Sequence, residues 1–191
     1  MDTEPSLSSE PPVIFRLIVP TDSLEDLTQL LHRAYRPLAE MGLRYVATYQ
    51  DADRTARRIA GRECYVSIGA GRIVATVTFR TASQTSGCPW YDRPNVSSFG
   101  QFAVDPAYQG RGIGSRLLDL CERRAVETGA DELALDTAEP AGHLIELYQR
   151  RGFRAVDCAQ WPDTNYRSVI MSKRLPQALA SRAGAGENPP E

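Results

Sequence analysis

Lysine and histidine are nearly absent from this 191-residue chain, in which Lys173 is the only lysine and two residues are histidines. With 22 Lys and Arg residues against 24 Asp and Glu residues, the net charge is −2. So balanced a chain lacks the electrostatic footprint of a nucleic-acid-binding protein, and we predict no nucleic-acid partner. The scarcity of lysine also excludes a P-loop, because its phosphate-binding motif requires one.

Long hydrophobic runs are also missing. The longest, residues 13–15 and 17–19, are separated by Arg16 and fall far short of the roughly 20 apolar residues that a transmembrane helix needs. Residues 1–12 contain neither the basic nor the hydrophobic region of a signal peptide. We therefore predict a cytoplasmic protein with no membrane partner.

Cysteine is sparse and irregularly spaced, at positions 64, 88, 121 and 158, with no CxxC pair. This spacing is typical neither of a disulfide framework nor of a zinc site. We expect reduced cysteines, as in cytoplasmic proteins, and no bound metal.

The overall composition, with 42% hydrophobic and 24% charged residues, is that of an average globular protein. The length fits one domain with tails. Residues 1–12 are rich in Ser, Pro and Glu, and residues 176–191 end in an Ala-Gly-Ala-Gly-Glu-Asn-Pro-Pro-Glu run, so both segments are predicted to be disordered. The domain is expected to span residues 13–175.

Between the tails, two periodicities alternate. Alternating, β-branched segments predict strands over residues 15–19, 64–68, 73–79, 97–104, 132–137, 153–158 and 166–173. Helical spacing covers residues 24–34, 52–60, 113–125 and 144–148. Gly69-Ala70-Gly71 predicts a hairpin between the second and third strands. The order β-α-α-β-β-β-α-β-α-β-β indicates an α/β fold, with a mixed sheet of about seven strands flanked by about four helices.

The segment with the clearest chemistry is Gln109-Gly110-Arg111-Gly112-Ile113-Gly114-Ser115, between a predicted strand and a predicted helix. Glycines let the backbone turn tightly with its N–H groups facing one concavity, and the first helical turn adds unpaired N–H donors. Such a loop suits a phosphate or pyrophosphate, to which Arg111 or Arg116 adds charge. It is not a dinucleotide fingerprint, because Ser115 stands where that motif requires glycine.

Two motifs in this chain resemble those of the GNAT N-acetyltransferase superfamily. Phe102-Ala103-Val104-Asp105-Pro106, followed by Gln109-Gly110-Arg111-Gly112-Ile113-Gly114 and Leu117-Leu118, is similar to its acetyl-coenzyme A motif. Leu147-Tyr148-Gln149-Arg150-Arg151-Gly152-Phe153 is similar to its later helix and strand. With element order included, the resemblance covers roughly residues 15–175, and it implies a single domain whose central sheet is splayed.

The resemblance implies acetyl-coenzyme A as cosubstrate and transfer to a primary amine by direct attack. The pantetheine arm would pair with the backbone of Phe102, Ala103 and Val104, between splayed strands 97–104 and 132–137. The pyrophosphate would lie on the backbone of the glycine loop, which comprises Gln109, Gly110, Arg111, Gly112, Ile113, Gly114 and Ser115. Tyr148 matches the family tyrosine that protonates the leaving thiolate, as a phenol can do as a general acid.

Two positions depart from the family pattern. Ala141 stands where many relatives have a cofactor-contacting asparagine, and His143, two residues later, is expected near the pantetheine or the acceptor. Residues 97–101 contain no glutamate to act as general base, which leaves a water chain, Asp136 or Glu63. Since the family forms no covalent intermediate, we do not expect Cys88 to act as a nucleophile.

For the acceptor, the resemblance points to the first two helices and to the loop before the cofactor strand. Their aromatic residues Tyr35, Tyr45, Trp90 and Tyr91 suit a small amine or amino acid. Segment 161–167 is expected to close the same cleft. Many relatives form dimers, so the resemblance is compatible with a homodimer. Two alternatives remain: a catalytically silent acyl-coenzyme A-binding module, and an enzyme that uses the glycine loop for another nucleotide.

Overall fold

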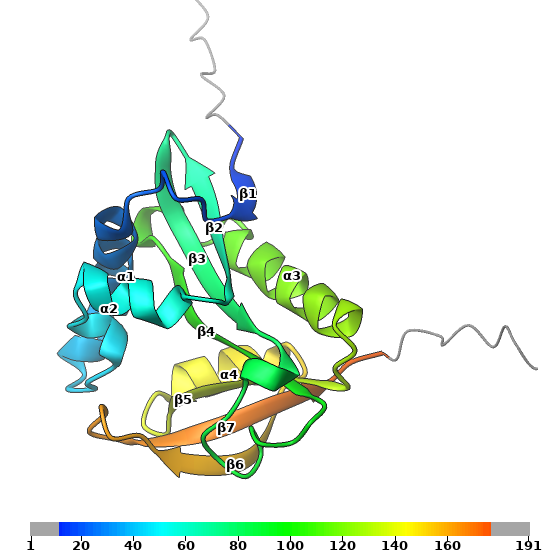
Figure 1. Ribbon diagram of the computed structural model, residues 1–191. Helices are drawn as coiled ribbons and strands as arrows, with labels where there is room; N and C mark the ends of the chain where they lie inside the picture. Colours follow the sequence, from blue (N-terminus) through cyan, green and yellow to red (C-terminus); the bar gives the residue numbers. More distant parts are fainter. Residues whose placement is uncertain (1–11, 177–191) are drawn as a thin grey trace, which may run out of the picture.

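The computed structural model describes residues 12–176. The two predicted disordered tails lie outside the described residues, apart from Pro12 and Pro176. Strands and helices follow the predicted order (Figure 1). The strands are β1 (Ile14–Leu17), β2 (Glu63–Gly69), β3 (Arg72–Arg80), β4 (Val96–Val104), β5 (Glu132–Ala138), β6 (Arg154–Gln160) and β7 (Arg167–Arg174). The α-helices are α1 (Leu24–Glu40), α2 (Ala52–Ile59), α3 (Ile113–Glu127) and α4 (Gly142–Arg150).

All seven strands form one mixed sheet in the order β1-β2-β3-β4-β5-β7-β6. Neighbouring strands are antiparallel except β4 and β5, which run parallel and are connected by α3. The predicted hairpin joins β2 and β3 through Ala70 and Gly71, both with positive φ. The predicted fold class, a mixed sheet of seven strands with four helices, is confirmed.

The sheet opens between β4 and β5. The two strands pair only at their beginnings, where Val96, Ser97 and Ser98 lie opposite Glu132, Leu133 and Ala134. Beyond Ser98 the remaining residues of β4, 99–104, have no partner on β5. The strand ends therefore splay apart and leave a wedge between their backbones, as the family resemblance implied.

Helices cover both faces of the sheet, with α1 and α2 on the left of β2–β4 in Figure 1 and α3 on the right. Alternation along the strands divides the core between the faces. Val66 packs with Leu27 and Leu30 of α1, whereas Val77 packs with Leu117 of α3. Helix α4 joins the α3 face through Tyr148. None of the helices within residues 12–176 combines the length and hydropathy needed to cross a bilayer.

Helix α1 is longer than the apolar spacing predicted, because it continues to Glu40 through Pro37. Proline has no N–H to donate to the carbonyl four residues earlier, so it usually ends a helix. Here the last turn is held by Met41, whose N–H bonds to the carbonyl of Pro37, and by the burial of Leu38. The four cysteines are all unpaired.

Candidate active site

The glycine loop between β4 and α3 has a backbone that favours glycine. Gly110 and Gly112 have φ angles of 76° and 75°, in the left-handed region that side chains disfavour. Gly112 caps α3 without a side-chain hydrogen bond, and the first helical donor is the N–H of Arg116, which bonds to the carbonyl of Gly112. The preceding N–H groups of the first turn, on residues 113–115, have no acceptor within residues 12–176, and unpaired N–H groups at the start of a helix are suited to an anion.

Short contacts hold this loop against the end of β4. A Cβ on Gly114 would lie 3.1 Å from the Phe102 ring, so the helix approaches the strand more closely than a larger residue allows. The side-chain amide of Gln109 donates to the carbonyl of Val104. The buried carboxylate of Asp105 accepts the N–H of Ala107 and pairs with Arg33 of α1 at 2.9 Å. The loop is thereby fixed in place at the open end of the wedge.

A cavity of about 780 Å³, the larger cavity, runs from this loop into the wedge. Every residue predicted to bind the cofactor lies on its wall except Arg111. These wall residues are Phe102, Ala103, Val104, Gln109, Gly110, Gly112, Ile113, Gly114, Ser115 and His143. The resemblance alone placed His143 there, near the start of α4. The guanidinium carbon of Arg111 instead lies 4.9 Å from the centre of the Tyr108 ring, and that of Arg116 lies over the ring of Phe15.

A second, smaller cavity of about 380 Å³ lies on the α2 side of the sheet. Its walls come from α2, the end of β3, the middle of β5, the first residues of β4 that have no partner on β5, and residues 161–166. Arg54, Arg58 and Arg80 bring positive charge to it, and Asp136 and Asp163 bring negative charge. The predicted closing segment, 161–167, supplies Trp161, Asp163, Thr164 and Tyr166.

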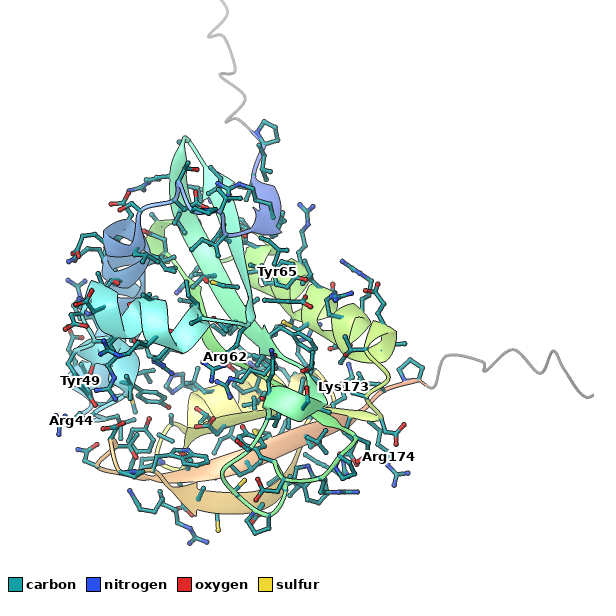
Figure 2. All side chains as sticks on the ribbon, viewed as in Figure 1. Arg44, Tyr49, Arg62, Tyr65, Lys173 and Arg174 are labelled. Atoms are coloured by element: carbon teal, nitrogen blue, oxygen red, sulfur yellow. The ribbon has the colours of Figure 1, made fainter. Side chains whose placement is uncertain are left out.

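Hydrogen bonds hold the segments around the smaller cavity together. The hydroxyl of Tyr49 donates to the carbonyl of Asp163, and the side chain of Asn165 both accepts the N–H of Arg44 and donates to the carbonyl of Gly42. The ring of Tyr49 also faces the guanidinium groups of Arg44 and Arg54. Figure 2 labels Arg44 and Tyr49 together at the left edge of the molecule. The segment after α1 is thereby fixed to the loop between β6 and β7.

The two cavities share part of their walls, formed by Tyr35, Tyr45, Phe102, Asp136 and Tyr148. These residues come from the helical segment before α2, the two splayed strands and α4. Because of this shared wall, the two cavities adjoin each other.

Tyr148 is buried at this junction. Its ring packs edge to face on Phe99 and Phe153, with centroids 6.1 and 6.0 Å away. Burial raises the pKa of its phenol well above the usual 10, so the hydroxyl keeps its proton at neutral pH. That hydroxyl makes no hydrogen bond to any residue in the range 12–176, which leaves it available to donate to a ligand.

Tyr35 and Tyr45 occupy the two edges of the wedge. The hydroxyl of Tyr35 donates to the carbonyl of Phe102 on β4, and the hydroxyl of Tyr45 accepts the N–H of Ala138 on β5. Their ring centroids lie 5.4 Å apart, so the pair spans the opening. A pantetheine arm that pairs with the Phe102 carbonyl would have to share it with Tyr35.

Asp136 lines both cavities, and within residues 12–176 it is the one carboxylate that does so. Its oxygens accept hydrogen bonds from the hydroxyl of Tyr91 at 3.2 Å and from the indole N–H of Trp161 at 3.0 Å. Glu63, the other acid considered as a base, instead pairs with Arg124 at 2.7 Å and lines neither cavity. Of these two acids, the geometry therefore favours Asp136 as the general base.

The predicted acceptor-binding aromatics do not all reach the site. Tyr35, Tyr45 and Tyr91 line the smaller cavity, whereas Trp90 lines neither. The Trp90 ring packs beside the guanidinium of Arg93, whose carbon lies 4.2 Å from the ring centroid. Both residues lie in a turn, in which the N–H of Asp92 bonds to the carbonyl of Cys88, and this turn directs Tyr91 toward the cavity and Trp90 away from it.

Three basic residues of the smaller cavity, Arg54, Arg58 and Arg80, were not predicted from the sequence. The only sequence signal for Arg58 was the cluster of arginines in α2. Arg80 carries no local signal, because it enters the cavity only through the pairing of β3 with β4, where it lies opposite Ser98.

Comparisons with known proteins agree with this geometry. The sequence profile of the acetyltransferase (GNAT) family matches residues 24–153. The chain is 35% identical to the S-(2-succino)cysteine N-acetyltransferase of Bacillus subtilis (strain 168), over 73% of this chain and 82% of that protein. It is 29% identical to the S-alkylcysteine N-acetyltransferase of the same organism, over 73% and 78%. The fold resembles the ribosomal-protein-S18-alanine N-acetyltransferase of Escherichia coli, with a TM-score of 0.64 at 18% identity, covering 91% of this chain and all of that one.

The chain belongs to the GNAT acetyltransferase family. It is an N-acetyltransferase enzyme, and the family's acetyl donor is acetyl-coenzyme A.

Proposed function

We propose that this enzyme transfers the acetyl group of acetyl-coenzyme A to the primary amine of a small amino-acid derivative of the S-substituted cysteine class. The observation that carries the proposal is the shared wall of the two cavities. The larger cavity ends at the glycine loop, as a pyrophosphate requires, and the smaller one has the volume of a small-molecule site. The curated relatives, which are named for acetylating cysteine derivatives, support the acceptor class.

In this proposal, the pyrophosphate binds the unpaired N–H groups at the start of α3, and the pantetheine arm follows residues 102–104 of β4. The thioester then lies in the wedge beside Tyr148. The amine nitrogen attacks the thioester carbonyl directly, a C–N bond forms, and the C–S bond breaks. The rate acceleration comes largely from holding the two reactants together in the right orientation, as in other bisubstrate reactions.

The two protons are assigned to two side chains. Tyr148 donates its phenolic proton to the departing thiolate, whose charged form burial in the wedge also disfavours. Asp136 accepts a hydrogen bond from the acceptor nitrogen and takes its proton as the amide forms, when that nitrogen becomes acidic. The hydrogen bonds from Tyr91 and Trp161 hold the Asp136 carboxylate at the junction for this role.

The test is thiol release from acetyl-coenzyme A with a panel of primary amines, with the products identified by mass spectrometry. We expect S-substituted cysteines to be N-acetylated, and polyamines and lysine-containing peptides to react far more slowly. Tight acetyl-coenzyme A binding without acetylation of any amine would instead favour a catalytically silent binding module and would reject the proposal.

A further inference from the structure

The smaller cavity holds two arginines that have no carboxylate partner. Arg58 of α2 donates to the side-chain oxygen of Gln50 at 2.6 Å, and Arg80 at the end of β3 donates to the hydroxyl of Ser98 at 3.4 Å. Neither guanidinium forms an ion pair with a residue in the described part of the chain. Both are half-buried and line the cavity.

The third arginine of this cavity, unlike the other two, has a carboxylate partner. Arg54, one turn before Arg58 on α2, pairs with the carboxylate of Asp163 at 2.6 Å. The remaining acid of the cavity, Asp136, accepts hydrogen bonds from Tyr91 and Trp161. Arg58 and Arg80 therefore form no direct ion pair with either acid of the cavity.

These two charges also oppose each other. Burial lowers the pKa of Arg58. Among the charged side chains nearby, Arg80 and Arg54 lower this pKa further and Asp136 raises it, although an arginine remains protonated in any case. Arg80 likewise lowers the pKa of Arg62, which follows α2 and is labelled near the centre of Figure 2. Placing half-buried like charges together is costly unless an anion is bound between them.

The backbone beneath Arg80 accommodates its guanidinium. A Cβ on Gly100 would lie 2.5 Å from Nη2 of Arg80, so only glycine leaves room for the guanidinium in this position. Gly100 is among the splayed residues of β4 and lines the same cavity. The guanidinium of Arg80 thus lies directly over the strand that is expected to carry the cofactor.

We propose that Arg58 and Arg80 form an anion site of the acceptor cavity, selecting acceptors whose side chain carries a carboxylate in addition to the α-carboxylate. The inference rests on the proposed function, since it assigns this cavity to the acceptor. Guanidinium groups match carboxylates in geometry and charge, and two of them hold two carboxylates or bridge one. With the carboxylates on the arginines, Asp136 is the acid left to hold the amine at the wedge.

A matched pair of acceptors tests this site. S-(carboxymethyl)cysteine and S-(carbamoylmethyl)cysteine have nearly the same shape and differ by one negative charge. Calorimetric titration with each, in the presence of coenzyme A, measures acceptor binding independently of transfer. We expect the carboxylate to bind about 10- to 100-fold more tightly to the unaltered enzyme, the range of a charged hydrogen bond in a half-buried site.

The variants Arg80→Met and Arg58→Gln are expected to reduce this preference to about threefold or less, as fits the loss of such a bond. Gly100→Ala, which displaces Arg80 without removing its charge, is expected to weaken the preference too. The control variant Arg57→Met removes an exposed arginine of α2 that lines neither cavity, and it should leave the preference for the carboxylate acceptor unchanged. Melting temperatures and acetyl-coenzyme A affinity check that each variant is folded.

Equal affinity of the unaltered enzyme for the two acceptors, no binding of either, or a preference that survives both arginine variants would overturn the anion site. Thiol release measured in parallel separates this result from the proposed function. Arginine-dependent binding of the carboxylate without transfer would support the anion site and reject the transfer. Transfer to both acceptors at the same rate and with the same affinity would support the proposed transfer and reject the anion site.

Discussion

At the scale of single residues, the site is a group of tyrosines around one carboxylate. Burial raises the pKa of Tyr35, Tyr45, Tyr91 and Tyr148 above the ordinary value of a phenol. The nearby charge of Asp136 is a further cause for each of them. All four hydroxyls therefore remain protonated at neutral pH. Three of them hydrogen-bond to neighbouring residues, and the fourth, on Tyr148, has no such partner among residues 12–176.

Replacing Tyr148 by phenylalanine should separate catalysis from binding. Phenylalanine keeps the edge-to-face packing on Phe99 and Phe153, so the fold and the affinity for acetyl-coenzyme A should change little. The value of kcat should fall about 100-fold, at the low end for loss of a general acid, because a thiolate leaves readily. Steady-state kinetics and calorimetry measure the two effects. Turnover at the unaltered rate would remove Tyr148 from the mechanism.

The value of kcat/KM should rise with pH and then level off, with no decline on the alkaline side. Only the neutral amine attacks, so kcat/KM should increase with pH until it levels near the pKa of the amine, about 8 for an α-amino group. The phenol of Tyr148, whose pKa lies well above 10, should lose no proton up to pH 9.5. Initial rates between pH 6 and 9.5 test this, and a decline with a midpoint below pH 9 would contradict the assignment of the acid.

At the scale of elements, the site depends on the start of α3 and on the opening between β4 and β5. The three residue pairs that join these strands are all at one end, so the sheet is continuous there and open at the other. Gly112 ends the loop at the larger cavity, and a Cβ added to it would meet no atom within 4 Å.

Gly112→Asp and Gly112→Asn form a matched pair of variants at this position. Both residues tolerate positive φ to a similar degree, so both cost similar backbone strain. The aspartate places a negative charge where the pyrophosphate is expected, and should weaken acetyl-coenzyme A binding about 100-fold relative to the asparagine. Calorimetric titration of both variants checks the difference. Equal affinities would place the pyrophosphate elsewhere.

The order of elements and the glycine loop were predictable, because hydrophobic periodicity and glycine spacing are local signals. The arginines of the smaller cavity were not, although the resemblance led us to expect three of its tyrosines and segment 161–167. Arg80 reaches the cavity only through the register of β3 on β4 and the missing side chain of Gly100, and neither is visible in one sequence. The different directions of Trp90 and Tyr91 depend likewise on how the loop before β4 packs on the sheet.

At the scale of the whole molecule, a net charge of −2 coexists with a smaller cavity that is lined by three arginines and two aspartates, so the overall charge does not predict the charge of a cavity. The two halves of the sheet are joined by a short parallel pairing, and a ligand that fills the wedge contacts both halves. Ligand binding should therefore stabilise the entire fold.

Thermal unfolding should report this coupling. Acetyl-coenzyme A at 100 times its dissociation constant should add about 2.7 kcal/mol to the free energy of unfolding. For a chain of this size, that corresponds to a rise in melting temperature of about 5–10 °C. Differential scanning calorimetry with and without the ligand measures the shift. ATP at the same concentration should give a much smaller one, and an equal shift with ATP would indicate a different nucleotide site.

The central claim is direct transfer between two ligands that occupy adjoining cavities at the same time. Cys88 is buried outside both cavities, and burial raises the pKa of its thiol, so it offers no acetyl-enzyme route. The most direct measurement is a matrix of initial rates with acetyl-coenzyme A and S-(carboxymethyl)cysteine both varied. Double-reciprocal lines that intersect are the predicted result. Parallel lines, accompanied by an acetylated protein in the mass spectrum, would contradict the account.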